Sequence, residues 1–408
     1  MRENPIATAE PAAQVKARPF SMNAVPEIHF GAGRAASLAE DVKAISQGRR
    51  VLLVADAGVV DLGLVAPLEQ SLNEAGAATE LFADIAGEPK AAQIDAAADA
   101  ARRLRADAVV CIGGGSALDI GKLAACIAAG EADALSYALA AQPLPAAGLP
   151  KICLPTTAGT GSELSGTNIF ANGAGKKVWI AGQQTKPDRV LLDPLLTLSL
   201  PPHLTAWTGL DAFVHALEAC TNRQAHPGNS PFCHHALGLI AGALVTAVEE
   251  PGNVEARGAM LLGSAYAGIG IDNCGTALAH NLSHALAALA PVHHGLATAL
   301  ALDLTLAWSI EAEAESSGQP FAAAARACGL TAAAELSAWY SALMTRCGVE
   351  RRLPDAFAAF TPADLAREMR SAENRPMRDA SLRPVEDGDI DRFAAATLAL
   401  APNGDRSS

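Results

Sequence analysis

The chain has few aromatic residues and few charges for its length. Of its 408 residues, 4% are aromatic and 18% are charged, whereas 50% are hydrophobic, so small aliphatic side chains must fill the interior. An excess of basic residues is lacking as well, because 30 Lys and Arg stand against 43 Asp and Glu, a formal net charge of −13. The phosphates of nucleic acids and of anionic membranes repel such a chain. We therefore expect neither as a partner.

Long hydrophobic runs are also lacking. A helix needs roughly 18 or more apolar residues to span a bilayer. The longest candidate, residues 236–248, is shorter and is expected to be a buried helix. The N-terminus carries Arg2, Glu3 and Glu10 without the apolar segment of a signal peptide. These absences predict a soluble, cytoplasmic protein.

Closely spaced cysteine pairs are absent. The eight cysteines are scattered singly, with no C-x-x-C motif, at positions 111, 126, 153, 220, 233, 274, 328 and 347. This pattern favours buried free thiols in a reducing compartment over a disulfide framework or a thiolate metal site.

The rest of the chain falls into two regions with different residue patterns. Short β-branched runs alternate with Ala-rich helical stretches in the first half. Strands are expected at 51–55, 108–112, 151–154 and 189–192, and helices at 63–75 and 91–104. Strands separated by helices predict βαβ units and a mostly parallel sheet.

After residue 194 the strand signals stop and long Ala/Leu helices follow. They are expected at about 203–223, 232–249, 254–271, 275–289 and 295–315, with several more beyond. We predict a disordered leader over 1–21, an α/β domain over 22–200, an all-helical domain over 201–400 and a loose tail over 401–408, with the hinge at 198–202.

Nine of the ten histidines fall in one part of the helical region, between residues 203 and 294. Asp211 and His215 are four residues apart, as are His280 and His284, so each pair shares one helix face. A further pair, His293 and His294, opens the next helix. One carboxylate and imidazoles from three elements can bind a divalent cation such as Fe²⁺ or Zn²⁺. Spacing alone leaves open that these are hydrogen-bonded core residues.

A glycine-rich turn connects an expected strand to an expected helix at Ile112-Gly-Gly-Gly-Ser-Ala-Leu-Asp-Ile-Gly-Lys122. Backbone N–H groups at such a helix start can hold an anion. The spacing fits neither the P-loop nor the G-x-G-x-x-G fingerprint, so a plain tight turn is the alternative.

A second loop, Pro155-Thr-Thr-Ala-Gly-Thr-Gly-Ser-Glu163, directly follows the strand at 151–154. Its four hydroxyl groups and two glycines can donate hydrogen bonds and let a ligand approach the backbone. A simple polar loop would have the same composition.

Together and in this order, these motifs resemble the iron-dependent, group III alcohol dehydrogenase family of the dehydroquinate synthase-like superfamily. The resemblance runs from about residue 26 to beyond 308. The matching stretches are 113–122, 156–163, 193–202, Thr208-Gly-Leu-Asp-Ala-Phe-Val-His-Ala-Leu-Glu218 and the set His280, His284 and His294. The chain departs from the family pattern at Ala285 and His293, where the family commonly has proline.

The resemblance implies a nucleotide-binding α/β domain, a helical metal-binding domain and an active-site cleft between them. The implied metal ligands are Asp211, His215, His280 and His294, and the implied catalytic residue is His284. The implied cofactor-binding residues are Asp56, Gly113, Gly114, Gly115, Ser116, Asp119, Thr156, Thr157 and Thr160.

The implied activity is transfer of a hydride between NAD(H) and a small alcohol, aldehyde or ketone, with a metal that polarises the substrate oxygen. NAD is expected in preference to NADP, and Fe²⁺ with Zn²⁺ or another divalent ion as the alternative. A homodimer or higher homo-oligomer is expected. The alternatives are a maleylacetate reductase-like enzyme, a dehydroquinate synthase-like lyase that uses NAD and a metal, and a non-catalytic relative.

Overall fold

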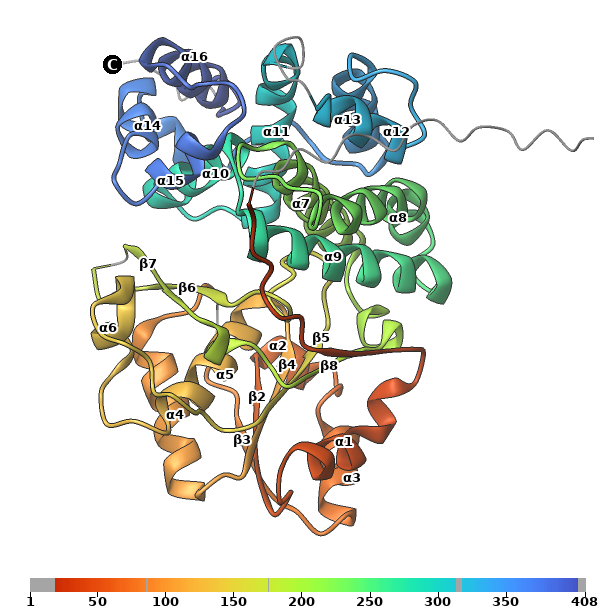
Figure 1. Cartoon of the computed structure of the whole chain (residues 1–408), viewed down its shortest axis with the longest axis vertical. Helices are drawn as coiled ribbons and strands as arrows, with labels where there is room; N and C mark the ends of the chain where they lie inside the picture. Colours follow the sequence, from red (N-terminus) through yellow and green to blue (C-terminus); the bar gives the residue numbers. More distant parts are fainter. Residues whose placement is uncertain (1–18, 86, 175, 313–317, 403–408) are drawn as a thin grey trace, which may run out of the picture.

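The computed structural model describes residues 19–85, 87–174, 176–312 and 318–402. An α/β domain and a helical domain are stacked along the long axis of the molecule (Figure 1). The predicted leader falls almost wholly outside the described residues, as does most of the predicted tail. The predicted fold class is confirmed: a parallel sheet comes first in the chain and helices follow it.

The α/β domain is built on six parallel strands in the order β1-β8-β5-β4-β2-β3. The strands are β1 (Glu27–Phe30), β2 (Arg50–Ala55), β3 (Ala78–Phe82), β4 (Ala108–Gly113), β5 (Lys151–Pro155) and β8 (Arg189–Leu192). The four predicted strands are β2, β4, β5 and β8, whose side chains are buried on both faces because helices cover the sheet. The two edge strands, β1 and β3, and the hairpin of β6 (Thr167–Ala171) and β7 (Lys177–Ala181) were not predicted.

The helices of the α/β domain connect these strands. They are α1 (Leu38–Ile45), α2 (Ala57–Asp61), α3 (Ala66–Glu74), α4 (Ala91–Leu104), α5 (Gly115–Ile127) and α6 (Ala134–Tyr137). Helix α4 has the limits that the sequence predicts. Helix α3 starts three residues later than predicted, because Gly63 adopts a positive φ of 74° in the turn after α2.

The helical domain begins at Pro202, whose ring suits the first turn of a helix. Its helices are α7 (Pro202–Thr221), α8 (Ser230–Glu249), α9 (Val254–Cys274), α10 (Leu278–Leu289), α11 (His294–Ile310), α12 (Pro320–Ala327), α13 (Glu335–Arg346), α14 (Pro362–Met369), α15 (Arg375–Ala380) and α16 (Asp387–Leu398). All five predicted helices are present. The domain boundary near residue 200 stays a prediction.

Helix α8 is longer than the apolar run 236–248 suggested. Among the described residues it is the one helix that is long and apolar enough to cross a membrane by length and composition alone. Its apolar face packs against α7 and α9 in the core of the helical domain. Core helices of globular domains have the same composition, so α8 carries no further conclusion.

The cysteines, all within the described residues, are unpaired as predicted. Seven are buried, and Cys328 is partly exposed.

Candidate metal and cofactor site

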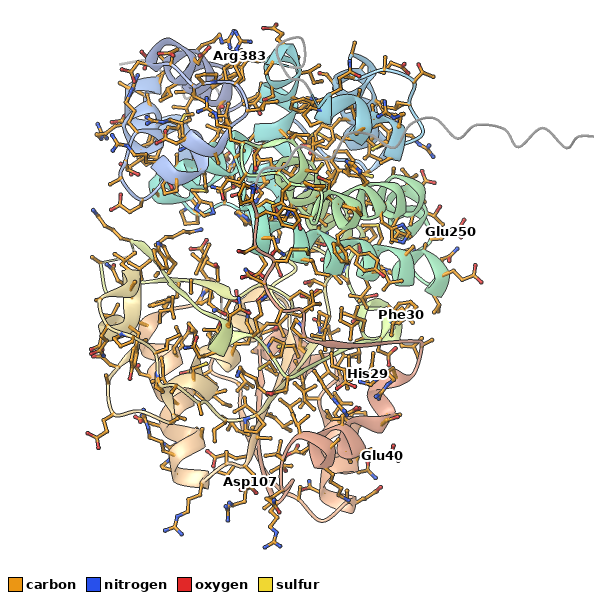
Figure 2. The ribbon with its side chains drawn as sticks, in the orientation of Figure 1. His29, Phe30, Glu40, Asp107, Glu250 and Arg383 are labelled. Carbon is orange, nitrogen blue, oxygen red and sulfur yellow. The ribbon has the colours of Figure 1, made fainter. Side chains whose placement is uncertain are left out.

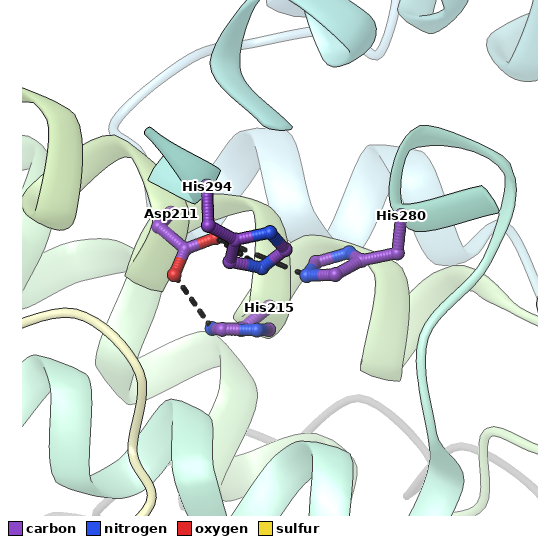
Figure 3. Close-up of side chains that lie close together, drawn as sticks. All are labelled: Asp211, His215, His280 and His294. Atoms are coloured by element: carbon purple, nitrogen blue, oxygen red, sulfur yellow. Dashed lines mark ion pairs between the residues drawn. The ribbon is translucent and has the colours of Figure 1, made fainter. Parts of the chain in front are cut away.

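Three helices of the helical domain bring a carboxylate and three imidazoles together. Asp211 and His215 come from α7, His280 from α10 and His294 from the first turn of α11 (Figure 3). One donor atom from each of the four residues lies within 4.8 Å of the others. The structure therefore brings together the four residues that the family resemblance implies as ligands.

The Nδ1 atom of each imidazole has a partner outside the cluster. His280 Nδ1 lies 2.7 Å from Glu218 Oε2, His294 Nδ1 lies 3.2 Å from Ser283 Oγ, and His215 Nδ1 lies 3.3 Å from the carbonyl oxygen of Gly159. The Glu218 carboxylate and the Gly159 carbonyl can only accept, so His280 and His215 donate from Nδ1 and keep a lone pair on Nε2, as metal-ligating histidines commonly do. His215 Nδ1 also lies 3.8 Å from Asp211 Oδ2.

The carboxylate of Asp211 faces these imidazoles. Its Oδ1 lies 3.9 Å from His280 Nε2 and 3.7 Å from His294 Nε2, too far for hydrogen bonds. Both Asp211 Oδ1 and His280 Nε2 are buried without a partner among the described residues. Bonds of about 2.0–2.2 Å to one cation place its ligands roughly 3–4 Å apart. A divalent cation thus fits this group, and three nitrogens with one oxygen suit Fe²⁺ or Zn²⁺.

Burial favours the neutral, metal-binding form of two imidazoles in this group. It lowers the pKa of His215, and it lowers the pKa of His294 well below the usual value. His293, the alternative to His294, lies outside the group. Its ring sits 5.0 Å from that of Trp207.

His284 lies one turn beyond His280 on α10, beside the group but not in it. Its ring centroid is 5.5 Å from that of His294 and 6.3 Å from that of His280. Burial first, and the positive charge of Lys177 second, hold the pKa of His284 well below its usual value. A neutral imidazole next to the cation site can take up or release a proton.

The predicted cofactor residues gather at the carboxyl ends of β2, β4 and β5. Asp56 follows β2, and its Oδ1 accepts a hydrogen bond from Val59 N at the start of α2. Gly114 is the N-cap of α5, directly after β4. The neighbouring strands β2 and β4 lead to opposite sides of the sheet. Such a switch point is where open parallel sheets bind nucleotides.

The loop after β5 closes over this helix start. Thr156 N donates to Gly113 O at 2.9 Å. Added Cβ atoms on Gly114 and Gly115 would meet Thr157 at 3.5 Å and Thr160 at 2.9 Å. Glycines at these positions keep the N–H groups of α5 open to an anion.

Asp119 is placed differently from the other predicted cofactor residues. Its Oδ1 accepts from Ser162 Oγ at 2.5 Å and pairs with Lys122 at 3.2 Å, while its Oδ2 accepts from Ile169 N. Both oxygens are engaged within the protein, so any effect of Asp119 on a cofactor would pass through the loop that it holds. Ser116 lies in the first turn of α5, next to Gly115.

The same loop joins the cofactor side to the metal side. Gly161, with φ of 61°, packs against Gly268 of α9 so closely that an added Cβ would lie 2.4 Å from Gly268 Cα. Only glycine fits there. Beneath the loop, the fully buried Lys122 donates to the carbonyls of Ser162 and Ser165. The two groups of predicted residues therefore meet at the interface of the domains.

The sequence analysis did not predict the side chains that hold the four candidate metal ligands in place. Glu218 lies three residues after His215, on the same face of α7, and this spacing was the one available signal. Ser283 and Lys122 gave no signal of their own.

A parallel sheet with a candidate nucleotide site and a helical region with a candidate N₃O cation site are typical of one class, the two-domain metal- and dinucleotide-dependent oxidoreductases. The family model described as iron-containing alcohol dehydrogenase matches residues 26–194, and the C-terminal model of the same family matches residues 205–360. The chain belongs to the iron-containing alcohol dehydrogenase family.

Individual relatives agree with this assignment. Sulfoacetaldehyde reductase of Bilophila wadsworthia (strain 3_1_6) is 33% identical over 71% of this chain and 75% of its own length. 1,3-Propanediol dehydrogenase of Citrobacter freundii is 33% identical over 71% and 76%. The crystal structure of sulfoacetaldehyde reductase from Bifidobacterium kashiwanohense in complex with NAD⁺ superposes with a TM-score of 0.84 at 29% identity, covering 95% of this chain and 100% of that one. The prediction of an NAD- and metal-dependent oxidoreductase of alcohols and aldehydes is confirmed.

Proposed function

We propose that Asp211, His215, His280 and His294 hold one divalent cation, with Fe²⁺ expected and Zn²⁺ or another divalent ion as the alternative. The observation that carries this proposal is the convergence of four donor atoms within 4.8 Å, of which Asp211 Oδ1 and His280 Nε2 are buried and have no partner in the described part of the chain. Burial of such atoms is costly unless something binds them. When bound, the metal acts as a Lewis acid on the substrate oxygen and the nicotinamide exchanges the hydride.

The loops at the strand ends would bind NAD. The backbone N–H groups of Gly114, Gly115 and Ser116 would hold a pyrophosphate at the start of α5, where the helix dipole also favours an anion. Gly113, Thr156, Thr157 and Thr160 would line the nucleotide. The carboxylate of Asp56 would accept hydrogen bonds from the ribose hydroxyls and repel the 2′-phosphate of NADP. Hydrogen bonds to a charged group contribute about 1.5–3 kcal/mol, so a preference for NAD of roughly tenfold to a hundredfold is expected.

His284 would handle the proton of the reaction. Its neutral imidazole can accept the proton that an alcohol loses on oxidation, and the imidazolium can return it when an aldehyde is reduced. The depressed pKa of His284, caused mainly by burial, makes its protonated form a ready donor in the reducing direction.

The substrate class is tested with a panel of small alcohols and aldehydes under anaerobic conditions. NADH absorbance is followed with Fe²⁺ and Zn²⁺ supplied separately, and NADP is compared with NAD. The panel includes 1,3-propanediol and sulfoacetaldehyde, the substrates in the names of two relatives.

The panel also separates the alternatives. A lyase of the dehydroquinate synthase type would turn over substrate without net formation or consumption of NADH, and a non-catalytic relative would be silent with every compound. With maleylacetate added to the panel, a maleylacetate reductase-like enzyme would oxidise NADH with that compound and not with simple aldehydes.

We also propose a cytoplasmic homodimer or higher homo-oligomer. Eight unpaired cysteines suit a reducing compartment. The edge strand β1 leaves Phe30 47% exposed, and a second subunit could cover it. Sedimentation analysis of the purified protein tests the oligomeric state.

A further inference from the structure

The carboxylate of Glu218 joins α7 to the first turn of α10. Its Oε2 accepts hydrogen bonds from Ala277 N and His280 Nδ1, and its Oε1 accepts one from Ala279 N, each at 2.7 Å. Ala277 is the N-cap of α10 and has no side-chain oxygen with which to cap the helix. Glu218 therefore supplies, from another helix, the acceptors that the free N–H groups of a helix start require.

The same carboxylate determines which nitrogen of His280 carries a proton. Because Glu218 accepts from Nδ1, the proton is on Nδ1 and the lone pair is on Nε2. His280 Nε2 lies 3.9 Å from Asp211 Oδ1 and is buried, with no hydrogen-bond partner among the residues that the structure describes. One side chain thus sets the tautomer of His280, the plane of its ring and the position of the helix that carries it.

We propose that Glu218 is a positioning residue of the metal centre and that its carboxylate, rather than its size or shape, is what the centre requires. The proposal rests on the proposed function, since it assumes that the group around Asp211 binds a cation. Partners of this kind hold metal-ligating histidines in one tautomer, and their loss typically weakens metal binding about 10–100-fold.

A small cavity behind Glu218 makes Glu218→Gln a sharper test than truncation of Glu218 to alanine. It has a volume of about 30 Å³, and its walls include Glu218, Thr305, Ser381 and Arg383 but none of the four candidate ligands. Arg383 lies at the outer end of the helical domain (Figure 2). Such a space holds about two water molecules. Truncation to alanine would let water reach His280 Nδ1 and replace the lost acceptor.

Glu218→Gln avoids that replacement because glutamine fills the same space. Its amide NH₂ can only donate, so either His280 Nδ1 or a backbone N–H of α10 loses its acceptor. If the NH₂ faces His280, it favours the tautomer with the proton on Nε2. That nitrogen then has no lone pair with which to bind a metal.

Asp193 offers a matched control in the other domain. It is also a buried carboxylate, and it accepts three backbone hydrogen bonds, from Gly33, Ala35 and Leu195, but no imidazole. Asp193→Asn therefore reproduces the loss of backbone capping without touching a histidine.

The experiment measures the affinity of the folded, cofactor-free protein for Zn²⁺ by competition with a chelating dye. We expect Glu218→Gln to bind Zn²⁺ about 10–100-fold more weakly than the unmodified protein and Asp193→Asn to bind it equally well. The proposal is overturned if Glu218→Gln stays within threefold of the unmodified protein, or if Asp193→Asn weakens binding as much. Failure of the unmodified protein to bind Zn²⁺ or Fe²⁺ would instead overturn the proposed function.

Discussion

The two halves of the site are built by opposite means. On the candidate cofactor side, the start of α5 presents backbone N–H groups, and glycines at three successive positions from Gly113 leave room for the side chains of Asp56, Thr157 and Thr160 packed against them. On the metal side, four long side chains reach into one buried space, and Glu218, Ser283 and a backbone carbonyl hold the imidazoles. Cofactor binding should therefore weaken when atoms are added to the first half, and metal binding should weaken when atoms are removed from the second.

The largest effect is expected from removing a ligand on the metal side. His280→Ala leaves three donors, which hold a cation poorly, and the Lewis acid contributes several kcal/mol to catalysis. We expect loss of the metal and a fall in kcat of about a thousandfold or more, with an unchanged circular dichroism spectrum. Elemental analysis of the purified variant measures the metal.

His235→Ala is the control for that substitution, since His235 is an exposed histidine on α8 outside the metal group. It should keep full metal content. Full metal occupancy in His280→Ala would show that His280 is not a ligand.

A smaller effect is expected from His284→Gln, which retains a polar side chain but cannot carry the proton. General acid–base catalysis contributes typically 10²–10⁴-fold, so kcat should fall within that range while the metal content stays unchanged. The loss should be most visible at low pH in the direction of aldehyde reduction. Release of the metal by this variant would mean that His284 is a ligand and that the roles within α10 are reversed.

The sequence pattern and the family resemblance pointed to the four proposed ligands, but not to the residues that hold them. Asp211 with His215 and His280 with His284 have the four-residue spacing of one helix face, and histidine is an uncommon residue with few structural uses. Glu218 gave only the weaker signal of its three-residue spacing from His215, because a glutamate in a helix is ordinarily a solvated surface charge. Its role depends on hydrogen bonds from α7 to the first turn of α10, which spacing along one chain segment does not reveal.

The fold shows the same limit. Strand β8 and helix α4 were predicted with their observed bounds. A buried strand is a continuous apolar run, and in α4 the apolar residues recur with the period of a helix. The edge strands β1 and β3 were not predicted, because none of their residues is buried. Edge strands gain their partners from the sheet rather than from their own composition.

On the cofactor side, Gly115→Ala tests the addition of atoms. The new Cβ would lie 2.9 Å from Thr160 Cγ2, so the start of α5 or the loop after β5 must shift. Overpacking of this kind costs about 1–3 kcal/mol, and we expect NAD to bind about tenfold more weakly with unchanged metal affinity. Titration of protein fluorescence with NADH measures the binding.

Two further variants sharpen this test. Gly173→Ala, with open space around the added Cβ, should leave NADH binding unchanged. Replacing Thr160 with Ser in the Gly115→Ala protein removes the contacting methyl group and should restore part of the affinity. Equal NADH binding by Gly115→Ala and the unmodified protein would contradict the backbone-made site.

The smallest effect on turnover is expected from a change at Glu163, where the two halves meet. A change at this residue should instead affect the pH dependence of stability. Glu163 is 1% exposed, and its Oε1 has no partner among the described residues. Burial raises its pKa to about 7, an increase that the nearby charge of Lys122 opposes. Between its ordinary pKa and this raised value, the folded protein binds more protons at Glu163 than the unfolded chain does. The stabilisation is therefore present at low pH and is lost as the pH rises towards and through 7.

Glu163→Gln mimics the protonated form at every pH. Relative to the unmodified protein, it should be equally stable near pH 4.5 and more stable at pH 8, by at most about 3 kcal/mol. Thermal unfolding of the metal-free proteins at the two pH values measures this difference. Glu40→Gln, at an exposed site of the same domain (Figure 2), should follow the unmodified protein throughout. If Glu163→Gln also follows it, the carboxyl of Glu163 keeps its ordinary ionisation, and the junction of the two halves does not respond to pH through this residue.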